Sequence, residues 1–419
     1  MALAASHSRS VIFAKRNILY NVTVRQPCLL FSSNDTVSDG QRKAPSKKQW
    51  RKSQKKPPST DHLSWEEKLA DVVTPLWRLS YDQQLELKQK HQERILSQLS
   101  RHLTGDFQSQ STPVRSKLSF PVLPVLPSPV RDGYRNKSTF SVNRGVDGNA
   151  KTVGFYVGTG RKGNIVCVNG DHLLNMPEKH KLVARCYQDF IRLSSLEPCL
   201  LFHTGGHWRE ITVLGYKFRI SADAFFQVNQ AAAEVLYSTV RHLCFPSPED
   251  GGGRTKVGGT LLDVCCGTGA IGITISPRVD RIIGIELIEQ AVEDARHNAA
   301  LNDVLNCEFV RGKAEVALPG VMSRLSSAGG GLVAAVVNPA RAGLHYRVVR
   351  ALRNQPAIRR LVYVSCKPDG EAMRNFRELC CAPDPQRKLT GEAFSPTLAV
   401  PVDMFPHTPH CEVVLLFER

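Results

Sequence analysis

The chain has twelve cysteines in 419 residues, but no two of them form a C-x-x-C pair. Zinc fingers, zinc ribbons and many iron–sulfur proteins depend on such pairs, so their absence argues against a structural metal framework. The histidines of the segment 407–410 have no second ligand cluster that could complete a metal site. We therefore expect no metal, and the cysteine spacing does not suggest a disulfide scaffold.

Acidic residues are scarce at the amino terminus, where the first one is Asp35. Residues 1–60 hold twelve Lys and Arg against two acids, so this stretch carries +10 of the formal net charge of +17. Basic, acid-poor sequence of this kind is typical of a mitochondrial transit peptide, and the Lys/Arg/Pro/Ser run at 41–58 is typical of a disordered segment. A nuclear-import signal is the alternative. We expect residues 1–60 to be a transit peptide and disordered tail of a mitochondrial matrix protein.

Long uninterrupted apolar runs are also missing. The apolar segment 11–30 is interrupted by charged residues, which argues against membrane insertion. Between residues 64 and 103, apolar side chains recur at helical spacing on both sides of Pro75, which predicts amphipathic helices broken at that proline. The proline-rich stretch 120–129 predicts a semi-rigid linker.

A glycine turn follows an apolar strand in the carboxyl-terminal half. The strand 260–264 leads into Gly267-x-Gly269-x-x-Gly272, and a second strand ends at Glu286. Glycines let the backbone approach a ligand closely, and an acid at the end of the second strand can accept hydrogen bonds from ribose hydroxyls. This pattern fits a nicotinamide dinucleotide, whose fingerprint it matches, and it also fits S-adenosylmethionine.

Two chemically versatile side chains come next. The lone Cys366 ends a buried-type strand, and Glu412 begins the last hydrophobic strand. An open α/β sheet presents its reactive groups at such strand ends, so a thiol and a carboxylate at one edge suggest a nucleophile and a base. Methyl transfer to a weakly nucleophilic carbon needs a cysteine there and nicotinamide chemistry does not, which favours a methyltransferase.

Together these segments resemble the RNA uracil-5-methyltransferase family, most closely its animal mitochondrial branch. The matching segments, in chain order, are 221–230, the glycine turn, Glu286, Asn338–Arg341, Val364–Cys366 and Phe405–Glu412. They cover roughly residues 221–419, with a weaker match at 128–180. The resemblance implies an α/β fold with a Rossmann-like class I methyltransferase domain, built on a mostly parallel twisted sheet, and a smaller amino-terminal α+β RNA-binding domain.

The resemblance also implies an S-adenosyl-L-methionine-dependent mechanism. Cys366 would add to C6 of uracil as the nucleophile, and Glu412 would accept the C5 proton. The residues implied in cofactor binding are Gln227, Gly267, Gly269, Glu286 and Asn338. Two positions depart from the family pattern, since Lys367 replaces a usual asparagine and Asn338 stands where bacterial members generally have aspartate.

The expected partner is RNA, either tRNA or rRNA, and the sequence does not set the oligomeric state. Basic residues that could contact the RNA are Arg135, Lys137, Arg161 and Arg341. The predicted organisation is a tail (1–60), amphipathic helices and linker (61–117), a small RNA domain (118–220) and the methyltransferase domain (221–419).

The small domain is expected to be shortened. Relatives place a considerably longer stretch between the segments that here meet near residue 214, which predicts impaired RNA binding. Two alternatives stay open at this point. One is an RNA-binding protein with an inactive methyltransferase domain, and the other is a nicotinamide-dependent oxidoreductase.

Overall fold

The computed structural model describes residues 9–14, 19–24, 62–105, 118–158, 165–198, 210–214, 227–246, 257–327 and 332–419. The chain forms two compact units. The smaller unit comprises 1–73, 138–173 and 178–214, and the larger unit comprises 74–137, 174–177 and 215–419.

The smaller unit is an α+β structure, as expected from the sequence. Its sheet has the strand order β1-β2-β6-β3-β4-β5. The strands are β1 (Arg9–Ala14), β2 (Leu19–Val24), β3 (Lys137–Asn143), β4 (Thr152–Val157), β5 (Val166–Val168) and β6 (Glu210–Leu214). Two helices belong to the same unit, namely α1 (Trp65–Val73) and α3 (Glu178–Leu193).

Strands β1 and β2 lie within residues 1–60, which the sequence analysis assigned to a transit peptide followed by a disordered tail. They pair antiparallel with each other, and β2 pairs with β6 through Val22 opposite Val213. Their segments, RSVIFA and LYNVTV, are rich in the β-branched and aromatic residues that favour strands. The sequence analysis predicted no strands here, and the run 41–58, for which it predicted disorder, lies outside the described part of the chain.

The larger unit contains a seven-stranded sheet with the order β12-β13-β11-β10-β7-β8-β9. The strands are β7 (Thr260–Val264), β8 (Arg281–Glu286), β9 (Cys307–Arg311), β10 (Val333–Val337), β11 (Ile358–Ser365), β12 (Ser395–Val402) and β13 (Glu412–Glu418). The pairs from β11 to β9 are parallel, whereas β13 runs antiparallel to both β11 and β12. The predicted Rossmann-like, mostly parallel sheet is confirmed.

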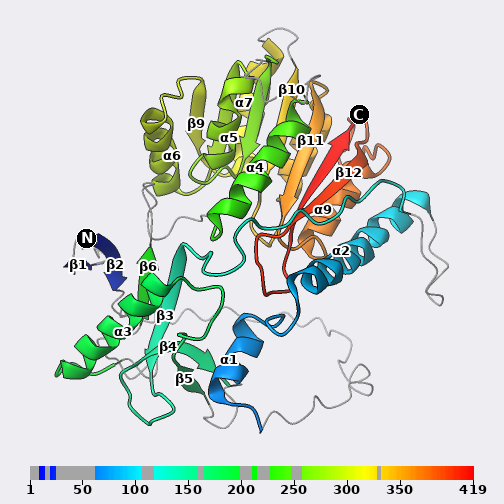
Figure 1. The fold of residues 1–419 in the computed structure, drawn as a ribbon. Helices are drawn as coiled ribbons and strands as arrows, with labels where there is room; N and C mark the ends of the chain where they lie inside the picture. The colour runs from blue at the N-terminus through cyan, green and yellow to red at the C-terminus, as the bar shows by residue number, and fades with distance from the viewer. Residues whose placement is uncertain are drawn as a thin grey trace, which may run out of the picture. The chain divides into compact units, whose positions relative to one another are not determined.

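Helices cover both faces of this sheet (Figure 1). One core joins alternate strand residues to α4 (Gln230–Cys244) and α5 (Ala270–Ile275). The core on the opposite face holds α2 (Tyr81–Thr104), α7 (Ala314–Ser327), α8 (Tyr346–Asn354) and α9 (Glu371–Cys380), while α6 (Glu289–Leu301) packs beside β9. Strands buried on both faces favour apolar residues at successive positions, which explains the apolar runs at 333–337 in β10 and 361–364 in β11.

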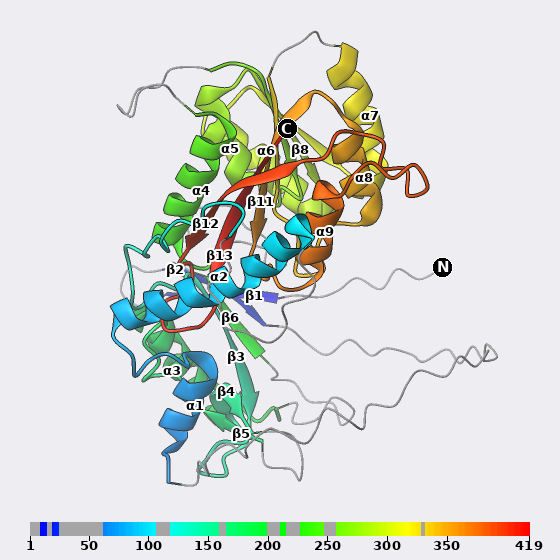
Figure 2. The same ribbon diagram turned by 90° about the vertical axis from the view of Figure 1, so that its right-hand side faces the viewer.

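Residues 74–137 pack with the larger unit. The break predicted at Pro75 lies between α1 and α2, and α2 begins with a capping box between Ser80 and Gln83. Helix α2 lies against α9 (Figure 2). The segment after it bridges β12 at Val122, so residues 118–137, which the sequence analysis assigned to the small domain, belong with the methyltransferase sheet. Among the described residues, no helix combines the length and apolarity needed to cross a bilayer.

Candidate active site

The candidate site lies at the edge of the larger sheet where its parallel strands end. Strand β7 is central, and the chain continues from it to β8 and β9 on one side before it returns to β10 and β11 on the other. At such a reversal the loops separate and leave a ligand crevice outside the carboxyl ends of the strands. Glu286, Asn338 and Cys366 all stand at these ends.

The turn after β7 has the backbone geometry that only glycine adopts without strain. Gly267 has φ of 54° and Gly269 has φ of 77°, both in the left-handed region. A Cβ atom at position 269 would lie 2.9 Å from the Phe309 ring, so packing also requires glycine there. The Gly267 N–H donates a 3.0 Å hydrogen bond to the Glu286 carboxylate, which links the two predicted cofactor-binding positions.

Glu286 is held firmly at the end of β8. Its other oxygen accepts backbone N–H groups from Leu287 at 2.8 Å and from Ile288 at 2.9 Å. The side chain is half-buried. An ordered carboxylate beside a glycine turn matches the hydrogen-bonding needs of an adenosine ribose.

Asp263 is a buried acid near the end of β7 that the sequence analysis did not single out. One of its oxygens accepts the Gly272 N–H at 3.1 Å, whereas Oδ1 has no hydrogen-bond partner among the described residues. Burial raises the pKa of Asp263 to about 7. A buried carboxyl oxygen left unpaired at the cofactor turn fits a site that receives a polar ligand. The sequence did contain a signal for this residue, because an acid within an otherwise apolar strand is unusual.

Cys366 and Glu412 are brought together by strand register. Strands β11 and β13 are antiparallel, and Ser365 pairs with Val413. The next position along each strand places Cys366 opposite Glu412. The pKa of the Cys366 thiol is raised, first by burial and then by the Glu412 carboxylate, and the Arg341 guanidinium only partly opposes this shift.

Glu412 is 3% exposed, and burial raises its pKa to about 8. A carboxyl group with this pKa is largely protonated at neutral pH, but its ionised form is a stronger base than an ordinary glutamate. The site therefore pairs a thiol and a basic carboxylate beside one cation, Arg341, which is the arrangement needed for covalent and proton-transfer chemistry.

The raised pKa of Glu412 gives a prediction about stability. The folded chain keeps a proton on Glu412 between its ordinary pKa of 4.5 and about 8, whereas the unfolded chain loses it, so stability falls as pH rises through this window. In the Glu412→Gln variant this loss is absent, so its stability relative to the unaltered chain should grow by about 3 to 4 kcal/mol between pH 5 and pH 8. Denaturant unfolding at both pH values measures the difference. A Glu234→Gln control at an exposed position of α4 should show no such growth. If the stability difference from the unaltered chain changed equally with pH in both variants, the prediction would be contradicted.

The other predicted residues lie in varied surroundings. Gln227 is buried before α4, and its backbone carbonyl accepts the Asn136 side-chain amide at 2.7 Å. Asn338 is half-buried at the end of β10, and its N–H donates to Val264. Arg341 is exposed beside Cys366.

Of the remaining RNA-binding candidates, Lys137 begins β3 and Arg135 lies two residues before it. Arg135 is half-buried, its Nε donates to the Lys137 carbonyl at 3.2 Å, and burial lowers the pKa of its guanidinium. Arg161 lies outside the described residues. In the described part of the chain, no group of three or more His, Cys, Asp or Glu side chains could hold a metal ion.

The strand order, the glycine turn and the acid that ends the second strand define a class I methyltransferase fold. Comparison with known proteins gives the family. The model of the tRNA (Uracil-5-)-methyltransferase family matches residues 215–419. The chain is 55% identical to tRNA (uracil-5-)-methyltransferase homolog B of Danio rerio, over 86% of this chain and 88% of that protein. It therefore belongs to the tRNA (uracil-5-)-methyltransferase family.

A further relative supports this assignment. The homolog B protein of Homo sapiens is 47% identical over 88% of this chain and 87% of its own length. The crystal structure of Pyrococcus abyssi tRNA (uracil-54, C5)-methyltransferase in complex with S-adenosyl-L-homocysteine superposes with a TM-score of 0.56 at 22% identity, covering 83% of this chain and 86% of that chain, and shares the fold. The predicted family and the enzyme class are confirmed, and the Danio rerio and Homo sapiens relatives both carry the name homolog B. None of these findings supports the alternative of a nicotinamide-dependent oxidoreductase.

Proposed function

We propose that this chain methylates C5 of uridine in RNA, with S-adenosyl-L-methionine as the methyl donor, Cys366 as the nucleophile and Glu412 as the proton acceptor. The observation that carries the proposal is the β11–β13 register, which sets the thiol and the carboxylate opposite each other at the cofactor edge of the sheet. The alternative of an RNA-binding protein with an inactive methyltransferase domain has no such observation in its favour.

The first step is covalent addition to the base. C5 of uracil is a poor nucleophile, and attack by the Cys366 thiolate on C6 forms an S–C6 bond and leaves an enolate whose negative charge reaches C5. Burial and Glu412 raise the pKa of the thiol, and the Arg341 guanidinium favours the thiolate and offsets part of that shift. S-adenosyl-L-methionine supplies an electrophilic methyl group to C5.

The second step removes the surplus proton. After methylation C5 carries both a hydrogen and the new methyl group, and the Glu412 carboxylate takes the hydrogen as a proton. The electron pair of the C5–H bond then re-forms the C5–C6 double bond as the S–C6 bond breaks. This releases 5-methyluridine and returns Cys366 to its thiolate.

The cofactor would lie against the glycine turn, with the ribose on Glu286. This agrees with the Pyrococcus abyssi structure, which contains S-adenosyl-L-homocysteine. Gln227 and Asn338 complete the proposed cofactor-binding set. Asn338 keeps a side-chain oxygen as acceptor, as an aspartate would, although without its charge.

Glu286→Ala should weaken binding of S-adenosyl-L-homocysteine by about 10- to 100-fold, because hydrogen bonds to a charged group are worth about 1.5 to 3 kcal/mol. Isothermal titration calorimetry measures the affinity. Glu289→Ala is the matched control, since Glu289 follows closely on α6 but is exposed and paired with Arg311. Equal affinities for the two variants would argue against the ribose contact.

The proposed RNA substrate is mitochondrial tRNA, rRNA or both. The names of the relatives support tRNA. The basic, acid-poor composition of residues 1–60 supports mitochondrial import. Cleavage of this segment would remove β1 and β2 from the sheet of the smaller unit. Failure of residues 1–60 to direct a fused reporter into isolated mitochondria would refute the location.

We also propose that the small domain is shortened. The alignment with the Danio rerio relative runs over 441 positions, whereas 86% of this 419-residue chain is about 360 residues, so roughly 80 positions have no residue here. This difference supports the shortening inferred near residue 214. The loss should weaken tRNA binding by about tenfold or more relative to that relative, with similar affinity for S-adenosyl-L-homocysteine. Filter binding and calorimetry measure the two affinities, and equal tRNA affinity would overturn the proposal.

The decisive test of the function uses RNA that contains 5-fluorouridine together with S-adenosyl-L-methionine. Fluorine cannot leave C5 as a proton, so an active enzyme becomes trapped as a methylated covalent adduct through Cys366. Denaturing electrophoresis and mass spectrometry detect the adduct. A folded, cofactor-binding sample that forms none would refute the covalent mechanism and favour the inactive alternative.

A further inference from the structure

The loop that leads into Glu412 is anchored by buried polar contacts. Strands β12 and β13 form a hairpin in which Val402 pairs with Glu412, and residues 403–411 make its loop, here called the hairpin loop. The Cys411 thiol donates to the Val402 carbonyl at 3.1 Å across the base of the loop. The position of Glu412 therefore depends on how this loop is held.

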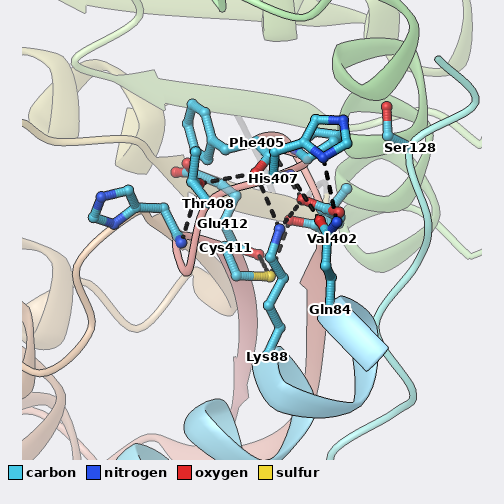
Figure 3. A network of polar contacts seen from close by, with 12 residues as sticks. Gln84, Lys88, Ser128, Val402, Phe405, His407, Thr408, Cys411 and Glu412 are labelled. Carbon is cyan, nitrogen blue, oxygen red and sulfur yellow. Dashed lines mark hydrogen bonds and ion pairs between the residues drawn. The ribbon is translucent and has the colours of Figure 1, made fainter. Parts of the chain in front are cut away.

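The first anchor is an ion pair between α2 and the hairpin loop. Lys88 Nζ lies 2.5 Å from Asp403 Oδ1, and both side chains are fully buried. Lys88 also donates to the Phe405 carbonyl at 3.1 Å (Figure 3). The Tyr81 hydroxyl donates to Asp403 at 3.0 Å. A buried charge is tolerated only when it is paired and hydrogen-bonded, so this geometry fixes both partners.

The second anchor is Gln84, one helical turn before Lys88 on α2. Its Oε1 accepts the His407 N–H at 2.7 Å, and its Nε2 lies 3.2 Å from His407 Nδ1. His407 has φ of 66°, a conformation that non-glycine residues rarely adopt. Its Nε2 lies 2.7 Å from Asp132, so the strained residue is held from two sides.

We propose that Lys88 and Gln84 are positioning residues, which hold the hairpin loop so that the Glu412 carboxylate meets the C5 proton of the base bound to Cys366. The proposal rests on the proposed role of Glu412. Helix α2 lies outside residues 215–419, the segment that the family model matches. A helix from outside the matched segment thus holds the loop that presents the base.

A positioning role for Lys88 and Gln84 should affect only one chemical step. Addition of Cys366 to C6 and methyl transfer to C5 require the thiol and the cofactor, and neither step needs Glu412. Only removal of the C5 proton does. A loosened hairpin loop should therefore leave formation of the 5-fluorouridine adduct intact and slow release of product from uridine RNA.

The double variant Lys88→Met/Asp403→Asn tests this. It removes both charges together, so that no buried charge is left unpaired. We expect its rate of adduct formation with 5-fluorouridine RNA to stay within about threefold of the unaltered chain. Tritium release from C5-labelled uridine RNA should fall by about tenfold or more, and the methylated covalent intermediate should accumulate on uridine RNA.

Lys90→Met is the matched control, because Lys90 lies on the same helix in a 2.5 Å ion pair with Glu86 whose side chains are 68% and 64% exposed. It should change neither rate. If the double variant does not fold, Gln84→Leu carries the same test through His407. Unchanged tritium release in the folded variant, or an equal fall in both rates, would overturn the positioning role. Absence of an adduct with the unaltered chain would instead refute the proposed function.

Discussion

Replacing Cys366 with alanine is expected to abolish methylation of uridine in RNA, with turnover reduced by at least about 10³-fold. Without the thiol no bond to C6 forms, and C5 stays too weakly nucleophilic to take the methyl group. Methyl transfer from labelled S-adenosyl-L-methionine measures turnover. The same variant should form no adduct with 5-fluorouridine RNA.

Cys186→Ala is the matched control for thiol loss. Cys186 is exposed on α3 and belongs to the smaller unit, so its removal should leave both readouts unchanged. Binding of S-adenosyl-L-homocysteine by the Cys366→Ala variant confirms that its sheet is intact. Methylation that persists in a folded Cys366→Ala sample would rule out covalent catalysis through this residue.

Replacing Glu412 with glutamine should have a different effect. Turnover should fall by about 10²- to 10⁴-fold, because an amide cannot accept the C5 proton. Cys366 can still add and the methyl group can still be transferred, so the methylated covalent intermediate should accumulate on ordinary uridine RNA. Denaturing electrophoresis, followed by mass spectrometry of the trapped complex, detects it.

Glu234→Gln, an exposed substitution on α4, should turn over normally and trap no intermediate. The pH profile gives a second check on Glu412. Because burial holds its pKa at about 8, turnover of the unaltered chain should rise from pH 6 to pH 8 as the carboxylate forms. A Glu412→Gln variant that loses turnover without trapping RNA would assign Glu412 to an earlier step.

The sequence predicted the sheet edge well because its signals are local. Apolar strands followed by Gly267 and Gly269, an acid at the end of the next strand and a cysteine at the end of another each follow from backbone rules for a parallel sheet. The pairing of Cys366 with Glu412 needed one further fact, the antiparallel direction of β13, which hydrophobicity does not reveal. The resemblance to the family supplied this link before the structure showed the register.

What the sequence could not predict lies in long-range polar contacts. Lys88 stands in a polar helix and reads as a solvent-facing residue, since lysines are rarely fully buried unless paired. Its partner Asp403 is more than 300 residues away, and no local pattern connects them. The strands β1 and β2 were not predicted either. The basic composition of residues 1–60 was given more weight than the two short segments rich in β-branched residues.

The antiparallel pairing of β13 with β11 determines where the chain can tolerate insertions and deletions. Cys366 and Glu412 are separated by a long connection that includes α9 and β12, yet their spacing is set by the six residue pairs between β11 and β13. Insertions or deletions within the connection can leave this spacing intact. A single residue added within either strand would shift the ladder by one step and turn its side chains to the opposite face of the sheet. The spacing of Cys366 and Glu412 therefore depends on the pairing of β11 with β13 and does not depend on the length of the connection between these strands.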